Sequence, residues 1–435
     1  MTKPMYRALL LLLCTLPIAA KAQFLMDMID TTKDAGKGML GIYKKFDHLR
    51  FSGYIQPQFQ IAESKGIKTF DGPDFGTNVN NRFTLRRSRV RIDYVHFGKE
   101  TKPGVQIVFQ FDVNERGFTI RDVWGRIFEN KYQSFAFTTG MFARPFGYEV
   151  NLSSGDRETP ERGRMSQTLM KSERDLGAMI TFEQRKKDAK LRYLKMDLGL
   201  FNGQGINATG DFDNSKDLIA RMALKPYPLS KKLTLSGGLS MLHGGLLQNT
   251  RYKYNVVNSG NIEKMQVDSS LTNIGAVSPR RYYGADMQLK WKNKKGFTEI
   301  RGEYVQGTQT GTANSSETPA ALVAGTDGFH IRKFNGAYIY FLQHLFSDKH
   351  QLLVKYDWYD PNTDVKGKQI GAAGANLSAA NIKYNTLGVG YANYLTENVK
   401  LILYYTFVKN EATSLTGYTG DIKDNVLTCR LQFRF

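Results

Sequence analysis

The amino-acid sequence predicts an all-β protein, a transmembrane antiparallel β-barrel of about 16 strands with short periplasmic turns and long extracellular loops. Three observations predict this fold: an amino-terminal export signal, a final strand with one apolar and one polar face, and a series of similar segments joined by links of unequal length. No run of about 18 or more apolar residues follows the amino terminus, so helical membrane spans are not expected.

Residues 1–22 have the form of a cleavable signal peptide. Lys3 and Arg7 precede an apolar run from Ala8 to Ala20, and the Ala-Lys-Ala at 20–22 has the small-x-small form that a signal peptidase cuts. The mature chain is therefore expected to begin near Gln23. Residues 23–49 would form a periplasmic segment, in which apolar residues near helical spacing favour a short helix before the barrel at 50–435.

Export restricts the partners of this basic chain. Loss of the three basic residues of the signal peptide takes the formal charge from +20 to +17, but an exported protein is not expected to bind nucleic acid. Cys14 is removed with the signal peptide, so Cys429 remains alone and no internal disulfide can form. The expected surroundings are outer-membrane lipid and lipopolysaccharide.

The carboxyl-terminal segment NVLTCRLQFRF alternates with a period of two. Leu427, Cys429, Leu431, Phe433 and Phe435 share one face, and the residues between them are polar. This pattern is typical of the last strand of a membrane barrel. An amphipathic strand of a soluble sandwich would show the same alternation and remains the alternative for this segment alone.

The rest of the chain favours the barrel, because similar segments alternate between short and long links. Links such as 293–295, 347–349 and 396–398 are tight, whereas 62–81, 143–174, 244–279, 310–331 and 361–379 are long. A sheet in hydrocarbon must close on itself to leave no unpaired edge. The expected strands are 50–61, 82–97, 103–113, 118–129, 133–142, 175–184, 190–201, 216–226, 232–243, 280–292, 296–309, 332–346, 350–360, 380–394, 398–410 and 424–435.

The stretch RFTLRRSRVRIDY at 82–94 is the main indication of function. With Val90, Ile92 and Tyr94 toward lipid, the side chains of Arg87, Arg89 and Arg91 share the lumen face, about 7 Å apart. Arg86 then falls on the lipid parity, which requires an interfacial position, a bulge or a later strand start.

Stacked arginines require compensation, either from fixed carboxylates or from mobile anions. The carboxylates on plausible lumen parities are Asp93, Asp112, Asp122, Glu299 and Glu303. Further cations on such parities are Arg126, Arg221, Arg301, Arg430 and Arg434. An excess of cations would attract anions into the pore. Complete local pairing would instead give a rigid wall without strong selectivity.

The link at 143–174 is the second indication of function. It carries Arg144, Arg157, Arg162, Arg164, Lys171 and Arg174 among few acids, and a link this long could fold into the lumen and narrow it. The planar guanidinium group matches two oxygens of an oxyanion at once and stays charged. The alternative is a solvated outer loop that binds lipopolysaccharide phosphates or nothing.

Six motifs together resemble a known family. RFTLRRSRVRIDY, VQIVFQFDV, IRDVWGRI, GMFARPFGYE, SERDLGAM and GLFNGQG occur in the order and spacing of the phosphate-selective porin O and P family of Gram-negative outer membranes. The resemblance is strongest from about 50 to 205 and implies a sixteen-stranded porin, usually a homotrimer, with an arginine- and lysine-lined lumen that conducts anions. The paired arginines of the family match Arg86 and Arg87, and its Arg-Asp-x-Gly segment matches Arg174, Asp175 and Gly177.

One departure from the family concerns the substrate. Many relatives carry a lysine where this chain has Ala143, and Arg144 follows one position later, which makes anion permeation a safer expectation than phosphate specificity. We expect small anions, phosphate among the candidates, to pass along Arg87, Arg89, Arg91, Arg126, Arg162, Arg164 and Arg174, with Arg86, Arg144, Lys171, Arg221 and Arg301 as further candidates.

Other functions remain as alternatives: a porin for sugars or peptides with weak selectivity, or an adhesin whose lumen is plugged. The six histidines are scattered and no G-x-S-x-G motif occurs, so no catalytic residue, metal or cofactor is expected.

Overall fold

The computed structural model describes residues 48–435 except 99–101, 116, 207, 209 and 261. The expected signal peptide at 1–22 and nearly all of the expected segment at 23–49 lie outside the described residues, so these two assignments stay predictions. Among the described residues, no helix is long and apolar enough to cross a membrane.

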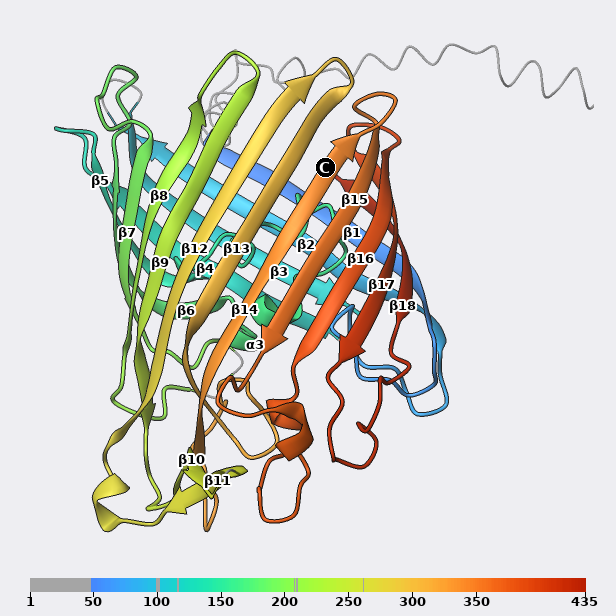
Figure 1. The fold of residues 1–435 in the computed structure, drawn as a ribbon. Coiled ribbons are helices and arrows are strands. Elements are labelled where there is room, and N and C mark those ends of the chain that lie inside the picture. Colours follow the sequence, from blue (N-terminus) through green and yellow to red (C-terminus); the bar gives the residue numbers. More distant parts are fainter. Residues whose placement is uncertain (1–47, 99–101, 116, 207, 209, 261) are drawn as a thin grey trace, which may run out of the picture. The chain divides into compact units, whose positions relative to one another are not determined.

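Sixteen strands form a closed antiparallel barrel, as the alternating segments predict (Figure 1). Each strand pairs with the next along the chain, and β9 pairs with β12 because a hairpin intervenes. The barrel strands are β1 (Leu49–Ala62), β2 (Asn81–Phe97), β3 (Pro103–Asn114), β4 (Gly117–Phe128), β5 (Phe135–Ala143), β6 (Arg174–Glu183), β7 (Leu194–Phe201), β8 (Asp217–Pro228), β9 (Leu233–Leu247), β12 (Val277–Asn293), β13 (Gly296–Gly311), β14 (Phe329–His344), β15 (His350–Asp360), β16 (Tyr384–Tyr394), β17 (Val399–Asn410) and β18 (Val426–Arg434).

The barrel closes between its first and last strands. β1 pairs with β18 from Tyr54 opposite Arg434 to Ala62 opposite Val426. Every barrel strand therefore has two neighbouring strands. These accept and donate the backbone hydrogen bonds that hydrocarbon cannot provide.

The long links gather at one end of the barrel, the lower end in Figure 1. One of them contains the hairpin of β10 (Lys253–Ser259) and β11 (Ile262–Asp268), which the sequence analysis did not predict. Met265 of β11 packs with Ile370, Leu377 and Ile382 from another long link, so these links share a small apolar core of their own. Short 3-10 helices lie at Leu271–Asn273, Gly367–Gln369 and Ala379–Asn381.

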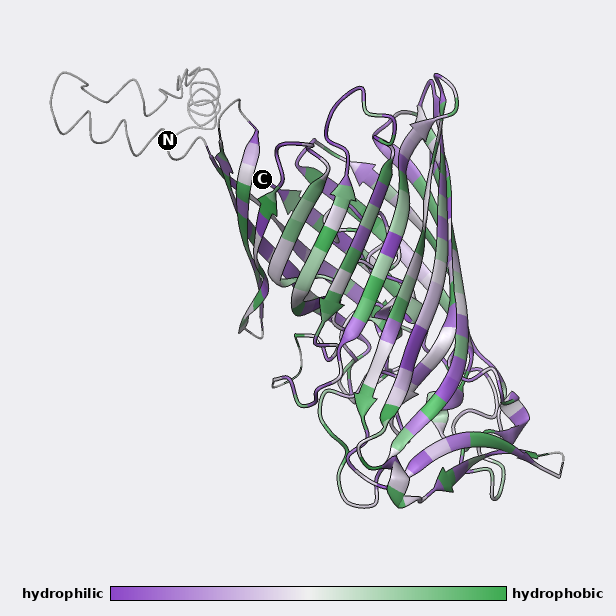
Figure 2. Ribbon diagram, turned by 90° about the vertical axis from the view of Figure 1, so that its left-hand side faces the viewer, coloured by the Kyte–Doolittle hydropathy of each residue, from purple (hydrophilic) through white to green (hydrophobic). Residues whose placement is uncertain are grey.

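The two faces of the barrel strands differ as the alternation predicts. In β14, Tyr338 and Tyr340 are buried inside the barrel, whereas Ile339 between them is 51% exposed on the outside. Figure 2 shows the same alternation of hydrophobic and hydrophilic residues along the strands. The outer face thus offers apolar side chains to lipid.

The barrel interior is partly filled by the link between β5 and β6, residues 144–173, which contains the only α-helix among the described residues, α3 (Arg164–Leu169) (Figure 1). Phe146 and Met165 from this link pack with Tyr282 and Phe334 from the strands in the main apolar cluster. Because this segment lies inside the barrel, we call it the constriction loop.

Candidate functional site

The constriction loop is tied to the wall of the barrel by buried polar contacts. Oε2 of Glu303 in β13 accepts the backbone N–H groups of Tyr148 and Glu149, both at 3.1 Å. On the opposite wall, Nε2 of Gln56 in β1 donates to the carbonyl oxygen of Ser154 at 2.9 Å. These contacts resolve the alternative that the sequence left open, because they place the loop within the lumen.

Glu149 anchors the middle of the loop. Its carboxylate accepts from Nζ of Lys355 at 2.8 Å, from the hydroxyl of Ser166 at 2.6 Å and from the backbone N–H of Gly163 at 3.0 Å. The hydroxyl of Tyr340 donates to it as well. Burial opposes ionisation of Glu149, but Lys355 and the hydrogen bonds outweigh it and lower the pKa of Glu149 to about 2.

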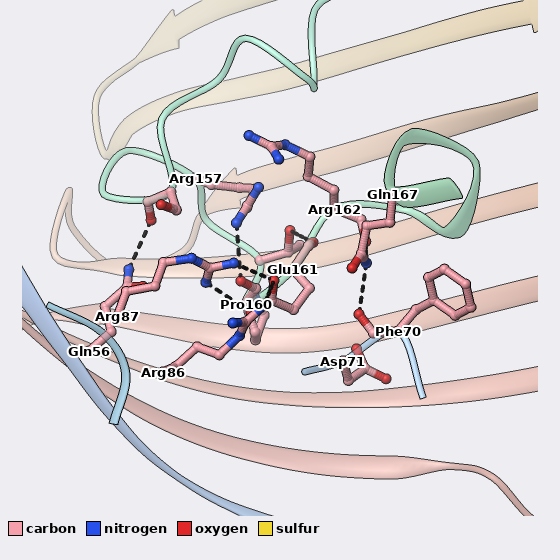
Figure 3. A network of polar contacts seen from close by, with 12 residues as sticks. Gln56, Phe70, Asp71, Arg86, Arg87, Arg157, Pro160, Glu161, Arg162 and Gln167 are labelled. Atoms are coloured by element: carbon pink, nitrogen blue, oxygen red, sulfur yellow. Dashed lines mark hydrogen bonds and ion pairs between the residues drawn. The ribbon is translucent and has the colours of Figure 1, made fainter. Parts of the chain in front are cut away.

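Glu161 is held by three arginines from two strands. It accepts from Arg87 at 2.7 Å, from Arg86 at 2.9 Å and from Arg430 of β18 at 2.8 Å. Figure 3 shows Arg86 and Arg87 converging on this carboxylate. Burial raises the pKa of Glu161, but the three arginines dominate and hold it well below its usual range.

The inward position of Arg86 corrects the expectation that it falls on the lipid parity. The pairing of β2 with β3 begins only at Ser88, so Arg86 and Arg87 lie in a part of β2 where that ladder does not impose alternation. Both side chains can then reach the same carboxylate. β2 itself begins at Asn81, so a later start of the strand does not account for this position, and what changes before Ser88 is the pairing with β3.

Two further arginines of β2 are also paired with carboxylates. Arg89 lies 3.1 Å from Asp112 and donates to the hydroxyl of Ser154 at 2.9 Å, and Arg91 lies 2.7 Å from Asp93. Fixed carboxylates thus compensate much of the predicted arginine row. Lysines and arginines nevertheless outnumber the carboxylates in the lining of the two cavities described below.

A second cluster surrounds Glu173 at the end of the constriction loop. Its Oε1 lies 2.7 Å from Arg121, 2.8 Å from Arg162 and 3.1 Å from Arg174. Arg174 also pairs with Asp122 at 3.2 Å. Arg121 is not among the pathway residues predicted from the sequence. In a regular strand, the side chains of Arg121 and Asp122 would point to opposite faces of the sheet.

A β-bulge explains the position of Arg121. In the β3–β4 pairing, Gln110 lies opposite Asp122 and Phe111 opposite Ile120, which leaves Arg121 as the extra residue. An extra residue shifts the alternation and re-aims its side chain.

Two large cavities lie inside the barrel. The inner cavity, ≈ 640 Å³, is lined by residues near the short turns such as Ser52 and Arg434. The outer cavity, ≈ 1260 Å³, reaches the long links at 64–74 and 422–424. Arg89 and Arg162 line both cavities, so the two meet at this pair, one from the wall and one from the constriction loop.

Both cavities have a positive excess. Eight lysines and arginines but three carboxylates line the inner cavity, and nine lysines and arginines but six carboxylates line the outer cavity. In a confined space of low dielectric constant such an excess raises the local concentration of anions.

The predicted pathway residues are distributed over these cavities. Arg91, Arg126, Arg174 and Arg221 line the inner cavity, whereas Arg86, Arg87, Arg164 and Lys171 line the outer cavity. Arg144 and Arg301 line neither. Arg301 is 3% exposed and pairs with Glu158 of the constriction loop and with Glu299, so it fastens the loop. Arg144 turns to a separate cavity.

Two lining arginines form no ion pair with any carboxylate among the described residues. Arg126 donates to the hydroxyl of Thr138 at 2.7 Å and lies 5.2 Å from the ring of Trp124. Arg164 lies between the rings of Phe70 and Tyr384, at 4.2 Å and 3.6 Å. Their charges are the least compensated of the predicted pathway residues that line these two cavities.

The described residues offer no arrangement for metal chemistry. In that part of the chain, no three His, Cys, Asp or Glu side chains are grouped so as to hold a metal ion. The site consists of guanidinium, ammonium and carboxylate groups around water-accessible space, an arrangement suited to guiding ions.

Comparison with solved structures shows the class of fold. The chain is similar to OprB of Pseudomonas putida (TM-score 0.56, 8% identity, 93% of this chain and 98% of that one). It is also similar to the outer membrane channel DcaP of Acinetobacter baumannii (TM-score 0.51, 13% identity, 89% and 97%) and to OmpF of Salmonella typhi (TM-score 0.50, 11% identity, 89% and 97%). Comparison with protein-family models finds no match, and neither does sequence comparison with characterised proteins. The fold is that of the sixteen-stranded outer-membrane porins.

Proposed function

We propose that the protein is an outer-membrane porin through which small anions diffuse. The observation that carries this proposal is the meeting of two cation-rich cavities at Arg89 and Arg162. Exposed apolar residues on the outer face, such as Ile180 at 53% and Leu198 at 50%, suit an outer-membrane location. An export signal at residues 1–22 would bring the chain there.

Anion preference follows from the charge excess at the point where the cavities meet. Arg89 pairs with Asp112, and Arg162 shares Glu173 with Arg121 and Arg174, so cations outnumber carboxylates in this group. Such an excess acts over about 8 Å at physiological ionic strength, so an ion passing between Arg89 and Arg162 would experience it. Phosphate is a candidate substrate because guanidinium groups bind its oxygens in pairs. Sugars or peptides are the alternative if the charges are too well compensated to select ions.

The test is the reversal potential of the purified protein in lipid bilayers under an asymmetric potassium chloride gradient. We expect a preference for chloride, which the double variant Arg89→Gln with Arg162→Gln should reduce. The control Lys131→Gln changes an exposed cation of the short link between β4 and β5 and should leave the potential as in the parent. A double variant as anion-selective as the parent would refute the proposed role of the two arginines, and a barrel without conductance would favour the plugged adhesin.

The family resemblance also implies a homotrimer. Chemical cross-linking of the protein in detergent, followed by electrophoresis with and without heating, should give a heat-sensitive band of three chains. A single-chain band under all conditions would contradict the trimer without affecting the channel proposal.

A further inference from the structure

A third cavity of ≈ 390 Å³ lies beside the pathway described above. Three segments form it. The constriction loop contributes Arg144 from its beginning and residues 169–172 from its end. The β7–β8 link contributes residues 203–204, and the β13–β14 link contributes residues from 312–320. We call it the side cavity. It shares Lys171 and Glu317 with the outer cavity and no lining residue with the inner one.

Arg144 is the buried charged group of this cavity, since Lys171 and Glu317 at its edge are more exposed. Arg144 is 4% exposed, and one terminal nitrogen of its guanidinium group donates to the carbonyl oxygen of Ser172. Its Nε is buried without a hydrogen-bond partner. No carboxylate among the described residues forms an ion pair with it. An arginine remains charged when buried, so this arrangement favours an anionic occupant.

The two carboxylates whose charges act on Arg144, Asp175 and Asp217, form no ion pair with it. Asp175 accepts the backbone N–H groups of Gly203 at 2.7 Å and Leu176 at 2.9 Å. Asp217 pairs with Arg280, which also donates to the carbonyl oxygen of Gly203 at 2.6 Å. These carboxylates moderate the positive charge of Arg144 but do not satisfy its free N–H group.

The rest of the wall is rich in polar groups. Four residues with hydroxyl groups line the cavity: Ser172, Thr312, Ser315 and Thr318. Gln204 is 8% exposed, and its Oε1 has no hydrogen-bond partner although its Nε2 donates to Asp213 at 3.3 Å. A buried acceptor without a hydrogen bond lowers the stability of the fold unless a donor from a ligand or water binds to it.

We propose that the side cavity binds a small hydroxylated oxyanion. The charged oxygens of the ligand pair with Arg144, and one of its hydroxyl groups donates to Oε1 of Gln204. The volume lies within the range of small-ligand pockets, which begins at about 300 Å³. This site lies beside the pathway between the inner and outer cavities, so a ligand bound there would lie off the route of ions through the channel.

The ion pair of Lys171 and Glu317 lines both the side cavity and the outer cavity. Nζ of Lys171 lies 2.6 Å from Glu317, and the two side chains are 59% and 30% exposed. An ion pair this exposed adds little stability and can open. A ligand can therefore enter the side cavity from the outer cavity.

The test is calorimetric titration of the full-length, detergent-purified protein with D-gluconate, a hydroxylated carboxylate. D-glucose serves as the neutral compound of similar size and acetate as the carboxylate without hydroxyl groups. We expect gluconate to bind, acetate to bind more weakly and glucose not to bind. Arg144→Gln should weaken gluconate binding about tenfold or more, because a charge-assisted hydrogen bond is lost.

Gln204→Met gives a second and milder test. It removes the free acceptor but keeps the size of the side chain, so gluconate affinity should fall to the level of acetate while acetate affinity stays unchanged. This variant decides the matter if Arg144→Gln does not assemble, as judged by heat-modifiability. Equal affinity of gluconate and glucose, or parental gluconate binding by Gln204→Met, would overturn the inference.

Comparison with Arg126→Gln distinguishes this site from the channel. If gluconate affinity falls in Arg126→Gln and not in Arg144→Gln, the ligand binds in the inner cavity, and the side-cavity inference fails. Reversal potentials of the parent protein would still report on the proposed channel function, so the two proposals can fail separately.

Discussion

Nζ of Lys355 in β15 lies 2.8 Å from Oε1 of Glu149 in the constriction loop, and the two side chains are 3% and 1% exposed. A charge buried to this degree is tolerated only with its partner, since an unpaired charge loses hydration without compensation. The pair therefore fixes where the loop crosses the lumen.

Replacing Lys355 with Met should release the constriction loop. Glu149 would keep its bonds to Ser166, Tyr340 and Gly163 but lose its countercharge, at a cost of about 3 to 5 kcal/mol. We expect higher and noisier single-channel conductance. The double variant Glu149→Gln with Lys355→Met removes both charges and should recover part of the parental conductance. Equal effects in the single and double variants would argue against the pair as the anchor.

Replacing Glu161 with Gln should weaken the link between β2, β18 and the loop. Arg86, Arg87 and Arg430 would then share no carboxylate at this point, and leaving buried charges unpaired costs about 3 to 5 kcal/mol. The temperature at which the folded band is lost in electrophoresis should fall. Glu397→Gln, at an exposed position in a short turn, is the matched control and should leave that temperature unchanged. The same temperature in both variants would count against the proposed link.

The selectivity of the channel should depend on pH near 6. Burial raises the pKa of Asp424, which lines the outer cavity, to about 6, although Arg164 partly opposes this. Burial likewise raises the pKa of Asp71 to about 6. As the pH falls through about 6, both carboxylates become neutral, so the positive excess and the preference for anions should increase.

Reversal potentials above and below pH 6 test this dependence. Asp424→Asn should reduce the change with pH, and Asp71→Asn with Asp424→Asn should remove it. Because the folded protein holds these protons more tightly than the unfolded chain, the two groups should also lower stability as the pH rises from about 4 to about 6. An unaltered pH step in the double variant would assign the effect to other groups.

An arginine on the outer face should impair assembly. Ile339 lies between two inward tyrosines of β14, and an arginine there would meet hydrocarbon at a cost of about 2 to 4 kcal/mol if the position is near mid-bilayer. Urea titration in lipid vesicles should show this loss for Ile339→Arg and almost none for Ile339→Leu. Equal stability of the two variants would mean that this face does not contact lipid.

The strands could be predicted from the sequence because alternation is a local property. Predicted and observed bounds agree within a few residues, as for the strand expected at 350–360 and found at His350–Asp360. Alternation also gives the inward face of Arg87 and Arg89. It cannot reveal a bulge, which depends on the partner strand, and Arg121 was missed for that reason.

The contacts of the constriction loop could not be predicted in the same way. The loop has no regular period, and most of the arginines that its carboxylates bind are distant in sequence. Glu161 and Glu173, for example, compete with mobile anions for the guanidinium groups, and only the three-dimensional arrangement shows which arginines they take. Arg144 and Arg301 have the right residue type in a plausible segment, but they turn to other partners.

The closure of the barrel between β1 and β18 constrains its biogenesis. The first strand is synthesised long before its partner, and Tyr54 can pair with Arg434 only after the last strand of the barrel has been made. Until then both ends of the growing sheet expose unpaired backbone groups, which promote aggregation. The chain would have to be shielded from other chains throughout this interval, and loss of the last strand alone would leave two permanently open edges.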